Sequence, residues 1–208
     1  MSWFLRNWDQ VAAGLVEHAV IAGTALAIAF GISLAVGIAA ARSRRIYAAA
    51  MAIGGFLYTI PTLALLALLI PLVGLGRTNA VICMVAFSLM ILVRNIATGI
   101  REAPAEVTDA ARGMGMSAAQ VLWRIELPLA LPVIVAGLRI AAVTVISVTV
   151  VAAYVNAGGL GTLIFNGIAS DHPPKIIAGA VAACLLAIAV DATLAALERR
   201  LQARGATA

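Results

Sequence analysis

Five long apolar runs, separated by short charged links, limit the folds open to this chain. A helix needs roughly 20 mostly apolar residues to cross the hydrocarbon core of a membrane. Backbone groups inside a bilayer must be satisfied within the chain, and helices do this locally. The pattern therefore predicts an all-α membrane protein with five transmembrane helices. They are expected at 20–41, 48–72, 78–100, 129–155 and 176–197.

The composition excludes an ordinary soluble domain. Of the 208 residues, 63% are hydrophobic and 11% are charged, and the mean hydropathy is +1.08. A soluble domain carries about 25% charged residues. The net charge of +5 does not indicate nucleic acid, because the arginines occupy short links between apolar runs. No low-complexity segment or Ser/Gly linker divides the chain, so we expect one domain over residues 1–208.

Basic residues concentrate in alternate links, and this predicts an orientation in the membrane. They are Arg42, Arg44 and Arg45 in the first link, Arg101, Arg112 and Arg124 in the third, and Arg199, Arg200 and Arg204 in the tail. Positive charge marks the cytoplasmic side of a membrane protein. We therefore predict an N-terminus outside, a cytoplasmic C-terminus and a cytoplasmic third link, residues 104–128.

This third link, called the insert below, contains signals for two short helices. Pro104 suits a helix start, and Gly113 and Gly115 favour a tight turn at its end. Ser117 and Gln120 have the spacing of a capping box, which predicts the start of a second helix.

The insert also has a fixed spacing of small and apolar residues, D-A-A-x3-G-x9-I-x-L-P. An amphipathic helix lying on the membrane is the simpler alternative, but it does not require this pattern over about 20 residues. We expect the final Leu-Pro pair to end the insert and to begin the fourth span. The candidate residues of the insert are Asp109, Ala110, Ala111, Gly113, Gly115, Ile125, Leu127 and Pro128.

The insert resembles the cytoplasmic E-A-A loop of ABC-importer permeases, which docks on a separate ATPase subunit. Residues 59–65, 71–76, 106–139 and 152–161 also resemble the short osmoprotectant permeases for glycine betaine, choline or carnitine, which have the methionine-importer-like fold. The resemblance covers most of the chain. It departs from the family at Asp109, where the loop's name implies Glu; Asp keeps the charge with a shorter reach.

The resemblance implies a permease subunit in a bacterial or archaeal inner membrane. Its partners would be a second permease subunit, identical or paralogous, two cytoplasmic ATPase subunits and an external solute-binding protein. ATP and Mg²⁺ would bind the ATPase subunits. The implied roles are a polar contact with the ATPase for Asp109, close packing for Ala110 and Ala111, and the turn for Gly115.

The sequence contains no signal for catalysis. There is no G-x-x-x-x-G-K-[ST] phosphate loop, and no grouping of nucleophile, base or metal ligands is evident. We therefore expect no enzyme activity, no metal and no cofactor on this chain.

Three ionisable residues lie inside the predicted spans: Arg94, Arg139 and Asp191. Such residues are costly in a bilayer and indicate a function or a partner. At a rise of 1.5 Å per residue, Arg94 and Asp191 lie roughly 9 Å and Arg139 roughly 15 Å from the cytoplasmic ends of their spans. We expect Asp191 to pair with one of the arginines, as an inner gate or a structural tie. Snorkelling to the headgroups is an equal alternative for Arg94.

Aromatic residues are too few to indicate a binding cage for a quaternary ammonium group, which aromatic faces would hold by cation–π attraction. Tyr58 and Tyr154 are candidates for the pathway, with ordinary helix packing as the alternative. Pro61 predicts either an ordinary kink in the second span or a bend that lines the pathway.

Two other functions are compatible with the apolar runs. One is an ABC permease for another small solute, such as methionine or phosphonate. The other is an ATP-independent carrier or a membrane scaffold. Carriers often show internal repeats, which this chain lacks, and they do not need the insert.

Overall fold

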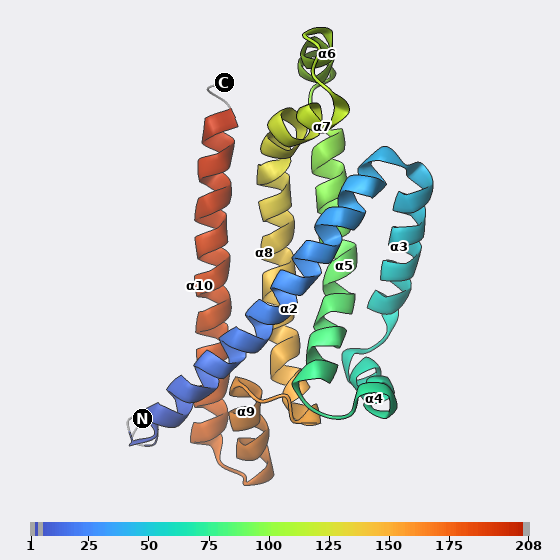
Figure 1. The fold of residues 1–208 in the computed structure, drawn as a ribbon. Helices are drawn as coiled ribbons and strands as arrows, with labels where there is room; N and C mark the ends of the chain where they lie inside the picture. The colour runs from blue at the N-terminus through green and yellow to red at the C-terminus, as the bar shows by residue number, and fades with distance from the viewer. Residues whose placement is uncertain (1–2, 4–5, 206–208) are drawn as a thin grey trace.

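The structure is a computed structural model that describes residues 3 and 6–205; these residues form helices and no strand. The all-helical prediction is therefore confirmed. The elements are α2 (Trp8–Arg42), α3 (Arg44–Thr59), α4 (Thr62–Val73), α5 (Arg77–Arg101), α6 (Ala105–Gly113), α7 (Ala118–Val121), the π-helical segment η1 (Leu122–Glu126), α8 (Leu127–Ala152), the 3-10 turn η2 (Ala153–Val155), α9 (Leu160–Ala169) and α10 (Pro173–Gly205) (Figure 1).

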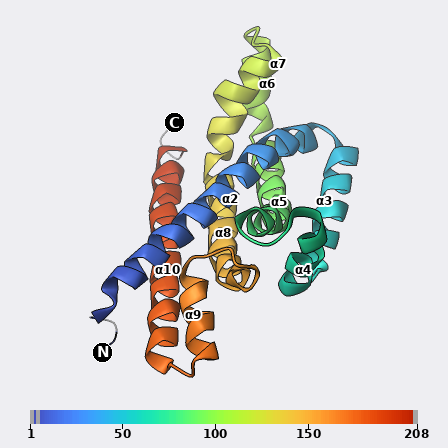
Figure 2. The same cartoon turned by 60° about the horizontal axis from the view of Figure 1, so that its bottom comes forward.

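The long helices form a layer crossed by α2. Helices α10, α8, α5 and α3 stand side by side, and α2 runs obliquely across one side of them (Figures 1 and 2). Helices α6 and α7 lie beyond one end of this layer, which we call the insert end. Helices α4 and α9 lie at the opposite end, the far end.

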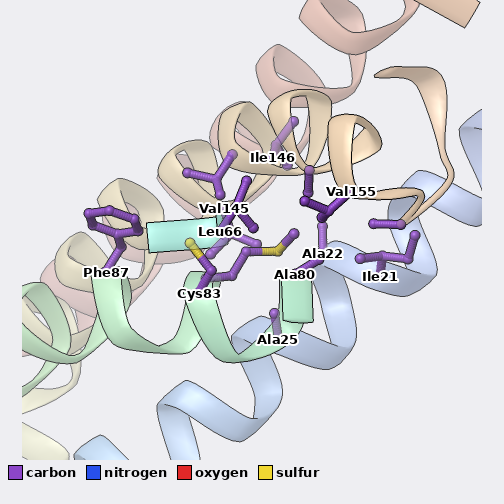
Figure 3. Packing of buried hydrophobic residues seen from close by; sticks show 14 of the residues in the cluster. Ile21, Ala22, Ala25, Leu66, Ala80, Cys83, Phe87, Val145, Ile146 and Val155 are labelled. Carbon is purple, nitrogen blue, oxygen red and sulfur yellow. The ribbon is translucent and has the colours of Figure 1, made fainter. Parts of the chain in front are cut away.

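The main core lies where α2, α4, α5 and α8 meet (Figure 3). Its residues are small or aliphatic, with Phe87 of α5 at one side and Leu66 of α4 filling the middle. A second core, between α2, α5 and α8, continues toward the insert end. The hydrophobic effect gives little drive for association between helices in lipid, so close packing of small residues is what holds them together.

Helices α5 and α8 pack closely at Gly137. A Cβ on Gly137 would lie 2.5 Å from the Cβ of Asn95, a distance that real side chains do not adopt. Gly137 therefore lets α8 approach the backbone of α5. Helix α8 also contacts α2. The ring nitrogen Nε2 of the buried His18 in α2 lies 3.1 Å from the backbone carbonyl of Ile146 in α8.

Four helices in the described part of the chain are long and apolar enough to cross a membrane. The predicted spans 20–41, 78–100, 129–155 and 176–197 fall within them. The bent pair α3 and α4 counts as a fifth span if it is taken as one unit.

The predicted second span, 48–72, is wrong as a single helix. It turns by 100° between α3 and α4 at Ile60 and Pro61. Proline disfavours helical geometry at the residue before it, and Ile60 is extended, with φ −74° and ψ 126°. The turn is much larger than an ordinary proline kink. It folds α4 back over α5, where Leu65 and Leu66 cover Cys83 and Phe87.

Helix α8 begins at Leu127 and Pro128, where the fourth span was expected to begin, but no break separates it from the insert. The chain stays helical from Ala118 to Val155. Within η1 the backbone widens, and the N–H of Leu127 bonds to the carbonyl of Leu122, five residues earlier. Proline lacks the N–H of a regular helical hydrogen bond, and here it follows a π-helical segment, a local irregularity of α-helices. The second helix of the insert is therefore an extension of the fourth span.

The Gly137 contact gives the first testable prediction. Gly137→Val should lower stability by about 1–3 kcal/mol, because the added atoms overlap Asn95 in a packed interface. The measurement is the thermal unfolding midpoint of the purified protein in detergent. Gly23→Ala is the matched control, since nothing lies within 4 Å of a Cβ at that position. Equal midpoints for the two variants would contradict the packing argument.

Candidate coupling site and its link to the spans

Helix α6 ends in a turn that glycine makes possible. Gly115 has φ +86°, a conformation that other residues rarely adopt. The N–H of Gly115 donates to the Arg112 carbonyl at 2.9 Å, and the N–H of Met116 donates to the Ala111 carbonyl at 3.2 Å. This pair of bonds is a Schellman motif, which satisfies carbonyls at a helix end. Gly113 remains helical as the last residue of α6.

The predicted capping box at the start of α7 is confirmed. The Ser117 hydroxyl accepts from the Gln120 N–H at 3.3 Å, and the Gln120 side-chain oxygen accepts from the Ser117 N–H at 2.7 Å. The Schellman turn and the capping box follow each other directly. Together they fix the direction of α6 relative to α7 with local hydrogen bonds.

Helix α6 is exposed on most of its surface, since Thr108 and Ala111 are its buried residues. We call Val107, Ala110 and Met114 the α6 outer face, because their spacing places them on one side of the helix. Val107 is 43% exposed and Met114 is 78% exposed. The carboxylate of Asp109 lies on another side and pairs with Arg112 at 3.1 Å. Such a surface pair contributes little stability and leaves Asp109 accessible.

The structure corrects the interpretation of Ala111. Its side chain is 1% exposed, so it does not present a surface to a partner. Ala111 lies on the side of α6 that packs against the rest of the insert, and its small size permits that packing. Of the two adjacent alanines, Ala110 is the exposed one and is free to contact another protein.

The last residues of the insert pattern connect the insert to the spans, at a point called the insert root below. Leu127 is buried in the core cluster that includes Ile100 and Ala130. Ile125 is half-buried, and Pro128 is exposed at the start of α8. These residues are therefore positioned to anchor the insert, whereas most residues of α6 are exposed.

Sequence reasoning missed an ion pair between a buried carboxylate and a half-exposed arginine at the insert root. Glu126 is 3% exposed, and its Oε1 accepts from Nη1 of Arg42 at 3.0 Å. The other terminal nitrogen of Arg42 contacts the second oxygen of Glu126, so the pair is bidentate. It joins the end of α2 to η1. A carboxylate between two apolar residues, Ile125 and Leu127, was the available signal.

Arg101 reinforces the same junction. It donates to the carbonyls of Ala40 and Ala41 at the end of α2, with the bond to Ala41 at 3.2 Å. Helix ends leave such carbonyls without a partner inside the helix. The guanidinium of Arg101 also lies 4.6 Å from the centre of the Tyr47 ring. The ends of α2, α3 and α5 and the root of the insert therefore meet at one charged junction.

A second ion cluster holds α10 to α8. Arg139 donates to both oxygens of Asp191, at 3.0 and 3.2 Å, and to Glu198 at 2.7 Å. The expected pairing of Asp191 with an arginine is present, and Arg139 is the partner. Glu198 was not anticipated because it lies beyond the predicted span. Arg94 takes no part: it is exposed and makes no hydrogen bond or ion pair within the described residues.

The pathway candidates Tyr58, Pro61 and Tyr154 are all exposed. The Tyr58 ring stacks edge-on against Phe87 at a centroid distance of 5.7 Å, and Tyr154 lies 6.2 Å from Phe165. The two tyrosines thus contact different neighbours. The described residues hold no group of three or more His, Cys, Asp or Glu side chains that could bind a metal ion.

Comparison with known proteins identifies the family. Residues 19–203 match the model of the binding-protein-dependent transport system inner membrane component. The chain belongs to this family. It is 33% identical to the carnitine transport permease protein OpuCB of Listeria monocytogenes over 97% of this chain and 92% of that one. It is 31% identical to the glycine betaine/carnitine/choline transport system permease protein OpuCB of Bacillus subtilis (strain 168), over 99% and 94%.

A solved structure has the same fold. A chain of the MetNI methionine ABC transporter, in an inward-facing conformation, superposes with a TM-score of 0.82 at 22% identity and covers 97% of each chain. The protein is thus the permease subunit of an ABC importer, a multi-pass protein of the bacterial inner membrane. Its partners are an ATPase, which hydrolyses ATP, and a solute-binding protein.

The ion pair at the insert root predicts a loss of stability in Glu126→Gln. The free energy of unfolding should fall by only about 1–2 kcal/mol. The Gln side chain still accepts one weaker hydrogen bond from Arg42, and water hydrates the rest of the half-exposed guanidinium. Thermal unfolding in detergent measures the loss. Glu106→Gln, in the exposed first turn of α6, is the control. The double variant Arg42→Glu with Glu126→Arg should be more stable than the sum of the losses in the two single reversals predicts. Strictly additive losses would contradict a direct pair.

The α8–α10 cluster predicts rescue by charge exchange. Arg139→Asp should lower the yield of folded protein strongly, because three carboxylates then lie together at membrane depth. Adding Asp191→Arg restores one opposite-charge pair and should recover folding in part. The readout is the yield of monodisperse protein with its thermal midpoint. A double variant no better than Arg139→Asp would show that the contact contributes nothing.

Proposed function

We propose that this permease forms the membrane pathway of an importer for a small osmoprotectant: glycine betaine, choline or carnitine. The relatives that match nearly the whole chain at 31–33% identity carry these solutes in their names. The methionine transporter is alike in fold at 22% identity, which gives no support for methionine as the solute. We further propose two permease subunits and two ATPase subunits in the assembly.

The proposed orientation places the insert end in the cytoplasm. Basic residues gather at that end, whereas toward the far end lie Arg6, Arg77 and Lys175 (Figure 1). This distribution follows the excess of positive charge on cytoplasmic segments. The N-terminus would then lie outside and the C-terminus inside. The basic residues at the insert end are Arg42, Arg44, Arg45, Arg101, Arg112, Arg124, Arg199 and Arg200.

Docking on the ATPase would involve α6, and its exposure on most sides is the observation that carries this proposal. A helix that enters a cleft must be free around most of its circumference. The α6 outer face would supply apolar contact, Ala110 the point of closest approach, and Asp109 a polar contact.

Motion of the ATPase would reach the spans by two rigid connections. The continuous helix from Ala118 to Val155 carries displacement directly into α8. The Arg42–Glu126 pair carries it to α2. Rigid-body movement of packed helices is a common form of such switching.

The pathway would run along the side of α5 and α8 opposite to α2, toward the second permease subunit. Arg94, Tyr58, Pro61 and Tyr154 are the proposed residues near it. The cluster of Arg139 with Asp191 and Glu198 would serve as a structural tie, since both helices that it joins belong to the same subunit.

Uptake in proteoliposomes tests the solute assignment. The permease is reconstituted with its ATPase and binding protein, and uptake of radiolabelled glycine betaine, choline and carnitine is measured with and without ATP. ATP-dependent uptake that requires every component is the expected result. A complex that hydrolyses ATP but moves none of the three solutes would overturn the solute class.

The coupling proposal predicts that Ala110→Arg uncouples the complex. A bulky charge at the point of closest approach should reduce solute-stimulated ATP hydrolysis and uptake about tenfold or more, as truncating or blocking an interface hot spot does. The thermal midpoint of the isolated permease should not change. Ala119→Arg, the same substitution at an exposed alanine of α7, is the control. Full coupling in Ala110→Arg would place the docking surface elsewhere.

A further inference from the structure

Arg94 is the one charged residue of α5 between Arg77 and Arg101. Its side chain is exposed, and within the described residues it has no hydrogen-bond or ion-pair partner. Arg139, at a similar distance from the insert end, is held by two carboxylates. An unpaired guanidinium facing hydrocarbon is costly. Arg94 therefore requires a polar surrounding that this subunit alone does not supply.

The packing of α5 defines the direction in which Arg94 points. The Met90 side chain of α5 packs against Gly54 of α3, and the Asn95 side chain packs against Gly137 of α8. Each residue turns the helix by about 100°, which places Arg94 between these two contacts. Helix α2 packs on the opposite side of α5, through Ile96 and its neighbours (Figure 1). Arg94 thus lies on the uncovered side of the layer.

The same side of α5 is closed toward the far end and open toward the insert end. Cys83 and Phe87, which share this side, are 0% and 5% exposed under α4. Arg94 and the half-buried Thr98 follow beyond the edge of this cover. The bend at Pro61 is what brings α4 into this place. Arg94 is therefore the first charged residue on this side of α5 between the part covered by α4 and the insert end.

The adjoining side of α8 has hydroxyl groups. Thr144 donates its proton to the Ile140 carbonyl at 2.8 Å, and exposed Ser147 donates to the Val143 carbonyl at 3.0 Å. Their oxygens keep lone pairs that can accept from water or a solute. This face of α8 also has the exposed Ile140, and the exposed side of α10 has mainly large apolar side chains. These are Ile177, Val181, Leu185 and Ile188.

We propose that Arg94 binds the carboxylate of the transported solute in the half of the pathway nearer the insert. This inference rests on the proposed function and names the chemical group that the pathway recognises. A guanidinium matches a carboxylate with two parallel hydrogen bonds. Glycine betaine and carnitine carry a carboxylate beside the quaternary ammonium group. Choline carries a hydroxyl in its place and is a net cation, which the charge of Arg94 repels.

The test compares Arg94→Gln with the wild-type protein on two solutes that differ at this one group. The complete reconstituted complex takes up glycine betaine or choline, each at a saturating concentration for the binding protein. Arg94→Gln should reduce uptake of glycine betaine about tenfold or more, as expected for loss of a charge-assisted pair. Uptake of choline should stay within about twofold or rise. Arg94→Lys keeps the charge without the bidentate geometry, so its uptake of glycine betaine should lie between that of the wild type and that of Arg94→Gln.

Three outcomes would overturn the proposal. Equal losses for both solutes would show a general structural role, and unchanged uptake of both would show that Arg94 is not on the route. A wild-type complex that imports choline but not glycine betaine would exclude carboxylate binding. Absence of wild-type uptake for every solute is a different result, because it rejects the proposed function itself.

A lipid phosphate is the other anion that an exposed arginine can bind. The uptake comparison is therefore repeated in vesicles of phosphatidylcholine alone and in vesicles that also contain phosphatidylglycerol. A solute site predicts the same effect of Arg94→Gln on glycine betaine in both. An effect that appears only with phosphatidylglycerol would assign Arg94 to the lipid headgroup and overturn the solute site. The thermal midpoint of Arg94→Gln should equal that of the wild type, because no contact within the subunit is lost.

Discussion

The structure depends on one constraint: a bilayer cannot hydrate charged or backbone groups. Every long apolar helix satisfies its own backbone, and the charged residues gather where helices end. The Arg42–Glu126 pair and the bonds from Arg101 lie at such an end and join α2, α5 and the insert. Where charge remains deeper, Arg139 is neutralised by Asp191 and Glu198 on the neighbouring helix. The charges at the junction of α2 and α5 therefore also fix where the insert stands.

Local features of the fold and the insert were predictable from the sequence, and features set by distant contacts were not. Four spans, the Gly115 turn and the Ser117–Gln120 capping box depend on neighbouring residues alone. Proline is ambiguous, because its effect depends on the surroundings. Pro61 produces a 100° turn since α4 finds a core to cover, whereas a π-helical segment absorbs Pro128 within a continuous helix. The burial of Ala111 and the partner of Glu126, 84 residues away, required the packed structure.

The insert has a rigid construction, which suits the proposed coupling to an ATPase. Its tip, α6, contributes little to the core and is exposed on most sides, but the hydrogen bonds of the turn and the capping box leave it little freedom relative to α7. A flexible tip would absorb the displacement of a partner by bending. A rigid tip on a helix continuous with α8 transfers displacement to the membrane instead. In the proposed coupling, the small residues and the caps of the pattern would serve this rigidity.

Arg94 and Arg139 show how the same side chain serves two purposes at comparable depth. Arg139 has a full set of carboxylate contacts, so a passing anion gains nothing by approaching it. Arg94 has none within the described residues, and the proposed solute site requires that water from the pathway solvate it before any solute arrives. Displacing that water costs part of the gain from a carboxylate contact, so binding stays weak. Weak binding suits a permease, since a solute held tightly in the pathway would not leave it.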